Sequence, residues 1–121
     1  MKIAIPVDEN KSEVFPSLGR TPCFIIFDNE TGKKVFLNNS AVSGQGGAGV
    51  KAAQLIVDEG VNVVLTERCG ENAAEVLKAG DIRIYKINNY SIDDNIQSFL
   101  KGELKPLGEI HKGVHHGGSI L

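Results

Sequence analysis

The sequence contains only two cysteines, no tryptophan and no long hydrophobic run. Cys23 and Cys69 lie far apart and do not form a disulfide framework, so we expect two reduced thiols in a reducing compartment. No apolar stretch approaches the ~18–20 residues of a membrane span, and the start MKIAIPVDEN lacks the features of a signal peptide. These absences predict a cytoplasmic protein that does not contact a membrane.

The sequence also lacks an excess of positive charge. Its 13 Lys and Arg residues stand against 15 Asp and Glu residues, a net charge of −2 with a pI near 5.9. Nucleic acid is therefore not an expected partner. With 121 residues, of which 41% are hydrophobic, the chain has the size and apolar content of one domain. We place that domain at residues 1–102, followed by a tail at residues 103–121.

The first third of the chain has the pattern of three strands. Residues 2–7 alternate apolar and other side chains, residues 23–27 form a continuous apolar run, and residues 33–38 follow a turn at Gly32. Turn residues between the second and third segments favour a hairpin. The sequence therefore predicts an antiparallel meander whose second strand is buried on both faces.

The pattern then changes to the helical period. Residues Gly49, Ala52, Ala53, Ile56 and Val57 form one apolar stripe. A second helix is predicted over residues 71–79, and a third follows Ser91 and stops at Gly102. Two strands, at residues 61–65 and 82–87, alternate with these helices. The order βββαβαβα predicts an α/β fold with a mixed five-stranded sheet ordered 3-2-1-4-5. The loops after strands one and four then lie side by side, where ligands bind such sheets.

A glycine-rich segment at residues 44–49 matches the pattern G-x-G-x-x-G and precedes a helix. It follows a meander rather than the first strand of a βαβ unit, which argues against a dinucleotide site. Backbone N–H groups at a helix N-terminus still form a site for an anion. A tight loop that only allows close helix packing is the alternative.

The cysteines and carboxylates are further candidates for metal-ligating or catalytic residues. Cys69 follows Arg68 at a predicted helix start, which favours a thiolate that ligates a metal, although an inert loop cysteine is an equal alternative. No histidine precedes residue 111 to serve as a base for nucleophilic catalysis. Cys23 is expected in the core. Three carboxylates, from Asp8, Glu9 and Glu67, are too few for a convincing magnesium nuclease site.

The tail holds all three histidines, His111, His115 and His116, among several glycines. A flexible backbone could close these imidazoles around a metal ion, but their spacing is not that of a standard zinc site. Solvated tail histidines are the simpler alternative.

Two stretches, GRTPCFIIFD and GQGGAGVKAAQLIVDEGVNVVLTERCGENAAEVLKAGDIRIYK, resemble the nitrogenase iron–molybdenum cofactor biosynthesis family over nearly residues 1–100. The resemblance implies a ribonuclease-H-like mixed five-stranded sheet, and binding or transfer of an anionic metal–sulfur cluster rather than catalysis. Members often carry a histidine shortly before the G-R-x-P motif, where this sequence has Pro16, Ser17 and Leu18. The tail histidines are a hypothetical replacement for it.

Together, these features predict a non-enzymatic carrier or scaffold for an iron–sulfur or molybdenum–iron–sulfur cluster or its precursor, which a donor or acceptor protein would deliver or receive. A regulatory or protein-interaction module that has lost cluster binding is the alternative, and a metal-dependent nuclease ranks last. The expected cofactor contacts are Arg20, Gly46, Gly47, Gly49 and Cys69, and the expected metal ligands are Cys69, His111, His115 and His116.

Overall fold

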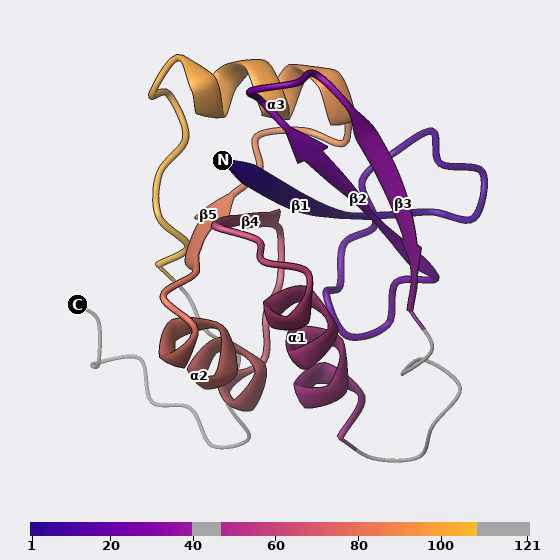
Figure 1. The fold of residues 1–121 in the computed structure, drawn as a ribbon, viewed down its shortest axis with the longest axis vertical. Helices are drawn as coiled ribbons and strands as arrows, with labels where there is room; N and C mark the ends of the chain where they lie inside the picture. The colour runs from indigo at the N-terminus through magenta and orange to yellow at the C-terminus, as the bar shows by residue number, and fades with distance from the viewer. Residues whose placement is uncertain (40–46, 109–121) are drawn as a thin grey trace.

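A computed structural model describes residues 1–39 and 47–108 of the chain. It confirms the predicted order of elements (Figure 1). In chain order these elements are β1 (Lys2–Val7), β2 (Cys23–Asp28), β3 (Lys34–Asn38), α1 (Ala48–Asp58), β4 (Val63–Thr66), α2 (Glu71–Ala79), β5 (Arg83–Lys86) and α3 (Ile92–Leu100).

The five strands form one mixed sheet in the predicted order β3-β2-β1-β4-β5. β2 runs antiparallel to both β1 and β3, so that Ile25 stands opposite Ile5 on one side and Phe36 on the other. β4 runs parallel to both β1 and β5. The winding therefore reverses between β1 and β4, and their carboxyl ends lie side by side, as the sequence predicted.

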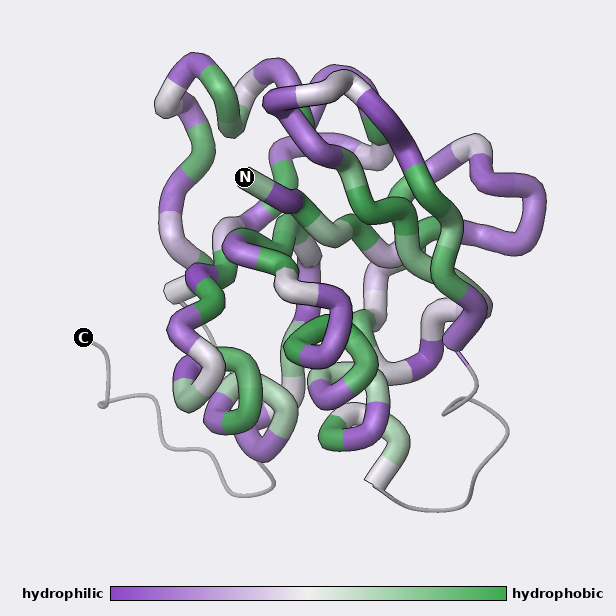
Figure 2. Tube along the Cα trace, in the orientation of Figure 1, coloured by the Kyte–Doolittle hydropathy of each residue, from purple (hydrophilic) through white to green (hydrophobic). Residues whose placement is uncertain are grey.

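The helices cover both faces of the sheet, with α1 and α2 on one face and α3 on the other (Figure 1). On the first face, Phe24 and Val64 pack with Ile56 and Leu77, while on the second face Ile5 and Leu65 pack with α3. Figure 2 shows the hydrophobic residues concentrated in the strands and on the sheet-facing sides of the helices. Burial on both faces explains why β2 reads as a continuous apolar run.

Several helix ends follow the signals that predicted them. Gly60 after α1 and Gly102 after α3 adopt φ values of 74° and 76°, the left-handed conformation that glycine tolerates best. Ser91 caps α3, because its side chain accepts a hydrogen bond from the backbone N–H of Asp94 at 3.2 Å. None of the helices in the described part of the chain has the length and hydrophobicity to cross a membrane.

The predicted tail begins later than residue 103. Leu104 is buried against α3 and the sheet, the Lys86 N–H donates to the Lys105 carbonyl at 2.9 Å, and the Leu107 N–H donates to the Ile84 carbonyl at 2.9 Å. Residues 103–108 therefore run along β5 as part of the folded body. Backbone pairing to an edge strand needs no side-chain periodicity, which is why the sequence pattern did not reveal it. Residues 109–121 lie outside the described part.

Candidate functional site

Three chain segments meet beyond the carboxyl ends of β1 and β4. The loop at residues 16–20 pairs with the segment between β4 and α2: the Arg68 N–H donates to the Pro16 carbonyl at 3.1 Å, and the Leu18 N–H donates to the Arg68 carbonyl at 3.2 Å. Ser17 and Arg68 form a parallel bridge between these bonds. This pairing fixes the loop beside the start of α2. The third segment is the N-terminal end of α1. We call the region formed by residues 16–20, residues 67–70 and the starts of α1 and α2 the glycine corner.

Glycines allow the two helices and the loop to approach closely at this corner. A Cβ atom on Gly19 would lie 3.0 Å from Gly49 Cα and 3.2 Å from Gly49 N, so only glycine fits there without movement. A Cβ atom on Gly49 would in turn lie 3.5 Å from Ala73 Cβ in α2. The N-terminal end of α1 therefore contacts both the loop and α2. Gly49 and the segment that contains Cys69 therefore lie at the same end of the molecule.

Both helices begin at the corner without a side-chain cap. Gly47, at φ 65°, is the N-cap of α1, whose first turn has no acidic residue. The first helical bond there joins the Lys51 N–H to the Gly47 carbonyl at 3.0 Å, so the preceding N–H groups lie outside the helical ladder. Gly70 is the N-cap of α2, and Glu71 occupies its first turn. The two N-termini create a positive potential, which Glu71 weakens on the α2 side.

Two arginines add positive charge beside these helix starts. Arg20 follows Gly19 directly, Arg68 precedes Cys69, and both are exposed. The backbone next to Arg20 is fixed by Thr21, a fully buried residue whose hydroxyl contacts the Val7 and Cys23 carbonyls at 2.8 and 2.9 Å. The sequence did not single out Gly19 or Thr21. The only signal was the G-R-T-P motif itself, because both roles depend on contacts distant in the chain.

The structure corrects the expectation that Cys69 is a thiolate. The side chain is buried, and its thiol donates to the Gly70 carbonyl at 3.6 Å. Burial raises the pKa of Cys69 to about 11, and the positive charge of Lys78 offsets only part of that rise. Desolvation therefore outweighs the helix N-terminus and the nearby cation, and Cys69 is a protonated thiol at neutral pH.

Cys69 packs in the same hydrophobic cluster as Leu18 and Ala73. The second cysteine, Cys23, is also buried, and burial likewise raises the pKa of its thiol. Its predicted place in the core is confirmed.

Two of the carboxylates near the strand ends, those of Asp8 and Glu67, have hydrogen-bond partners on other residues. The Asp8 carboxylate accepts hydrogen bonds from the Ser12 N–H at 2.8 Å and the Ser12 hydroxyl at 3.1 Å, and the backbone bond from Ser12 is the main reason that its pKa is lowered. Glu67 accepts the Tyr90 hydroxyl at 2.5 Å, which raises the pKa of Tyr90. Within residues 1–39 and 47–108, no group of three or more His, Cys, Asp or Glu side chains can hold a metal ion. The nuclease alternative thus gains no support.

Four predicted contacts lie outside the described residues: Gly46, His111, His115 and His116. The same holds for the first half of the G-x-G-x-x-G segment, of which Gly47, Ala48 and Gly49 are described.

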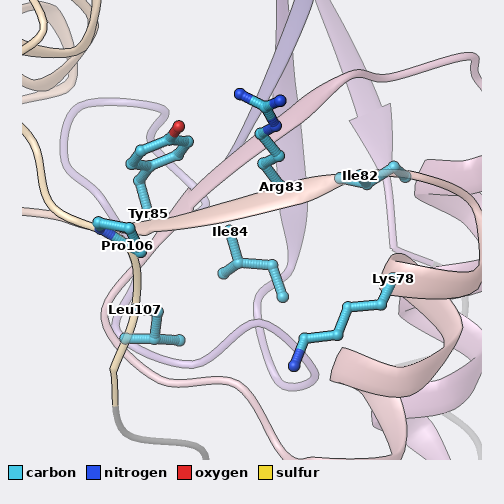
Figure 3. A pocket seen from close by; sticks show the side chains of 7 residues that line it. All are labelled: Lys78, Ile82, Arg83, Ile84, Tyr85, Pro106 and Leu107. Carbon is cyan, nitrogen blue, oxygen red and sulfur yellow. The ribbon is translucent and has the colours of Figure 1, made fainter.

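A separate cavity of about 340 Å³ lies between α2, β5 and the segment that follows α3 (Figure 3). Ile82, Ile84 and Leu107 form its apolar walls, and Lys78 extends along one side. It shares no residue with the glycine corner. Apart from Lys78 and Arg83 its lining is largely apolar, which suits an apolar group better than a small inorganic anion.

Most of the chain is similar to known proteins. The family model described as "Dinitrogenase iron-molybdenum cofactor" matches residues 1–102. An uncharacterized protein of Methanocaldococcus jannaschii is 39% identical over 108 residues, which cover 87% of this chain and 90% of that protein.

Two solved structures share the fold. The apo form of the orange protein from Desulfovibrio gigas superimposes with a TM-score of 0.81 at 27% identity, over 87% of this chain and 91% of that one. A Thermotoga protein with a provisional NifB name gives a TM-score of 0.78 at 29% identity, over 93% and 98% of the two chains.

Proposed function

Because the chain belongs to the dinitrogenase iron–molybdenum cofactor family, we propose that it binds an anionic metal–sulfur cluster or its precursor and carries it without chemical turnover. The cargo contains iron, or molybdenum and iron, together with inorganic sulfide. A second protein delivers or receives it. The observation that carries this proposal is the meeting of two uncapped helix N-termini beside two exposed arginines.

The glycine corner suits a small polyanion for electrostatic reasons. Each helix N-terminus carries about half a positive charge on its N–H groups, and glycine N-caps leave room for a ligand to approach the backbone. Gly47 and Gly49 present these groups on α1, and Arg20 supplies a full positive charge next to them. A charge-assisted hydrogen bond of this type contributes about 1.5–3 kcal/mol. Gly46 completes the proposed backbone contacts.

The described residues favour contacts to the anion over direct coordination of its metal. Among them, no cluster of metal-ligating side chains is present, and Cys69 is a buried thiol with a raised pKa. Cys69 would ligate the cargo only after leaving the hydrophobic cluster and losing its proton. His111, His115 and His116 stay in the proposal as additional ligands from the C-terminal segment.

Reconstitution with iron and sulfide tests this function. We expect charge-transfer absorption bands in the wild type that survive in Cys69→Ala, because the amides and Arg20 provide most of the binding. Arg20→Glu should weaken binding by about tenfold or more, since it replaces an attraction with a repulsion. Arg83→Glu, which changes an exposed arginine on β5, is the matched control and should bind as the wild type does. Failure of wild type and variants alike to develop bands would refute the proposal.

One observation favours the alternative, a regulatory or protein-interaction module that has lost the cluster. Pro16, Ser17 and Leu18 stand where the resemblance predicts a histidine, and Leu18 is buried against Cys69. Metal analysis of freshly purified protein separates the two functions. Iron or molybdenum with sulfide in stoichiometric amount supports the carrier, and protein free of both metals supports the module.

A further inference from the structure

The two edges of the sheet differ in how they are protected. The backbone of residues 105–107 covers the β5 edge through the hydrogen bonds to Ile84 and Lys86. At the opposite edge, β3 pairs only with β2 among the described residues (Figure 1). An open strand edge presents unpaired N–H and C=O groups that can pair with another chain.

The hydrogen-bond pattern shows which backbone groups of β3 face outward. The Asn39 N–H donates to the Pro22 carbonyl at 3.0 Å, and the Asp28 N–H donates to the Lys33 carbonyl at 3.0 Å. Hydrogen-bonded pairs alternate along an antiparallel ladder, so residues 35 and 37 also bond to β2. The groups of residues 34, 36 and 38 therefore point away from the sheet, arranged symmetrically about residue 36.

The side chains of β3 are apolar at its centre. Val35 is 56% exposed and Phe36 is 48% exposed, although both lie in the middle of a strand. Successive residues of a strand point to opposite faces, so the edge is apolar on both faces. Figure 2 shows this hydrophobic stretch between hydrophilic ends.

Two lysines lie next to this stretch, and one of them is paired with an acid. Lys34 Nζ lies 2.9 Å from the Asp93 carboxylate, so this lysine leaves little net charge on the edge. Lys11 Nζ lies 5.3 Å from the centre of the Phe36 ring.

We propose that two copies of this chain pair through β3 in antiparallel orientation, with the two-fold axis at Phe36. This register places Phe36 opposite Phe36 of the second copy, Val35 opposite Leu37, and Lys34 opposite Asn38. It uses every outward-facing backbone group of the strand. It also separates the lysines, whereas parallel pairing in register would place Lys34 next to Lys34. An apolar edge whose outward-facing backbone groups are arranged symmetrically about Phe36 is complementary to a copy of itself.

The interface is small, because β3 has only five residues. Contacts of this size fall below the area that permanent dimers bury. We therefore expect a monomer–dimer equilibrium that depends on protein concentration. The glycine corner does not contribute to this interface, so the inference stands independently of the proposed cargo.

Sedimentation velocity over protein concentrations up to about 1 mM tests the pairing. The wild type should shift from monomer to dimer as concentration rises. Phe36→Lys and Phe36→Glu should each raise the dimer dissociation constant at least about tenfold, because like charges then face each other across the axis. An equimolar mixture of the two variants should dimerise again, since opposite charges now meet.

The matched control is Leu100→Lys, which changes an apolar residue of similar exposure at the end of α3 and should leave dimerisation unchanged. Thermal unfolding curves verify that each variant is folded. A wild type that stays monomeric throughout, a dimer that tolerates Phe36→Lys as well as Leu100→Lys, or a mixture that stays monomeric would each overturn the proposal. If the wild type stays monomeric, the β3 edge is instead available to pair with an extended segment of another protein.

Discussion

Substitution of Gly19 by alanine tests how the glycine corner is held together. The added methyl group would lie 3.0 Å from Gly49 Cα and 3.2 Å from Gly49 N, closer than the ordinary contact distance of 3.4–4 Å. Both are backbone atoms and cannot rotate away. The loop at residues 16–20 must therefore move away from α1, against the hydrogen bonds that join it to Arg68.

Two opposing effects set the magnitude. Overpacking of this kind costs about 1–3 kcal/mol. Replacing glycine by alanine also reduces the conformational entropy of the unfolded chain, which stabilises the folded protein by about 0.4–1 kcal/mol. We expect a net loss of about 1–2 kcal/mol in the free energy of unfolding, which corresponds to a fall of roughly 3–10 °C in melting temperature for a domain of this size.

Urea unfolding followed by circular dichroism measures this loss. Gly108→Ala is the matched control, because a Cβ atom there meets nothing within 4 Å and the residue has no positive φ. The control should stay within about 0.5 kcal/mol of the wild type. If Gly19→Ala is as stable as Gly108→Ala, the close approach of the loop and α1 is not what holds the corner.

Three further predictions concern single side chains. The pKa of Cys69 is about 11 in the fold, against 9.0 as its ordinary value, so the unfolded chain loses this proton first. The Cys69 thiol alone should therefore lower the free energy of unfolding by roughly 2 kcal/mol between pH 9 and 11, and in alkaline urea titrations the fall in Cys69→Ala should be smaller than that of the wild type by this amount, with only the contributions of Cys23 and Tyr90 left. Leu104→Ala should lower the free energy of unfolding by about 2–4 kcal/mol, because Leu104 is buried. Leu100 is exposed, so Leu100→Ala should lower it by less than about 1 kcal/mol, and equal losses in the two variants would contradict the packing of residues 103–108. Glu71→Gln should strengthen anion binding about two- to fivefold in calorimetric titrations, because it removes a negative charge at the start of α2, and unchanged affinity would place the anion elsewhere.

Much of the fold could be predicted because local signals agreed with the final packing. The alternation over residues 2–7, the apolar stripe of α1 and the glycine at position 60 each reflect a period or a backbone conformation that the chain keeps in the fold. The order of strands then followed from general rules of chain connection. These signals also placed the helix starts of the glycine corner correctly.

The state of Cys69 could not be predicted from its neighbours in the sequence. A helix start and a neighbouring arginine favour a thiolate, but Leu18 and Ala73 exclude water from the side chain, and their proximity arises only from the fold. The covering of β5 by residues 105–107 was missed for a related reason, since backbone hydrogen bonds leave no mark on side-chain pattern.

The proposed function requires that backbone N–H groups at two helix starts bind a metal–sulfide anion. Titration of isotope-labelled protein with tetrathiomolybdate, followed by amide chemical shifts, tests it most directly, with sulfate as a control for simple charge. We expect saturable shifts at residues 47–51 and 70–74, larger for the thiometallate than for sulfate. Shifts confined to other parts of the chain, or no saturable shift at these helix starts, would contradict it.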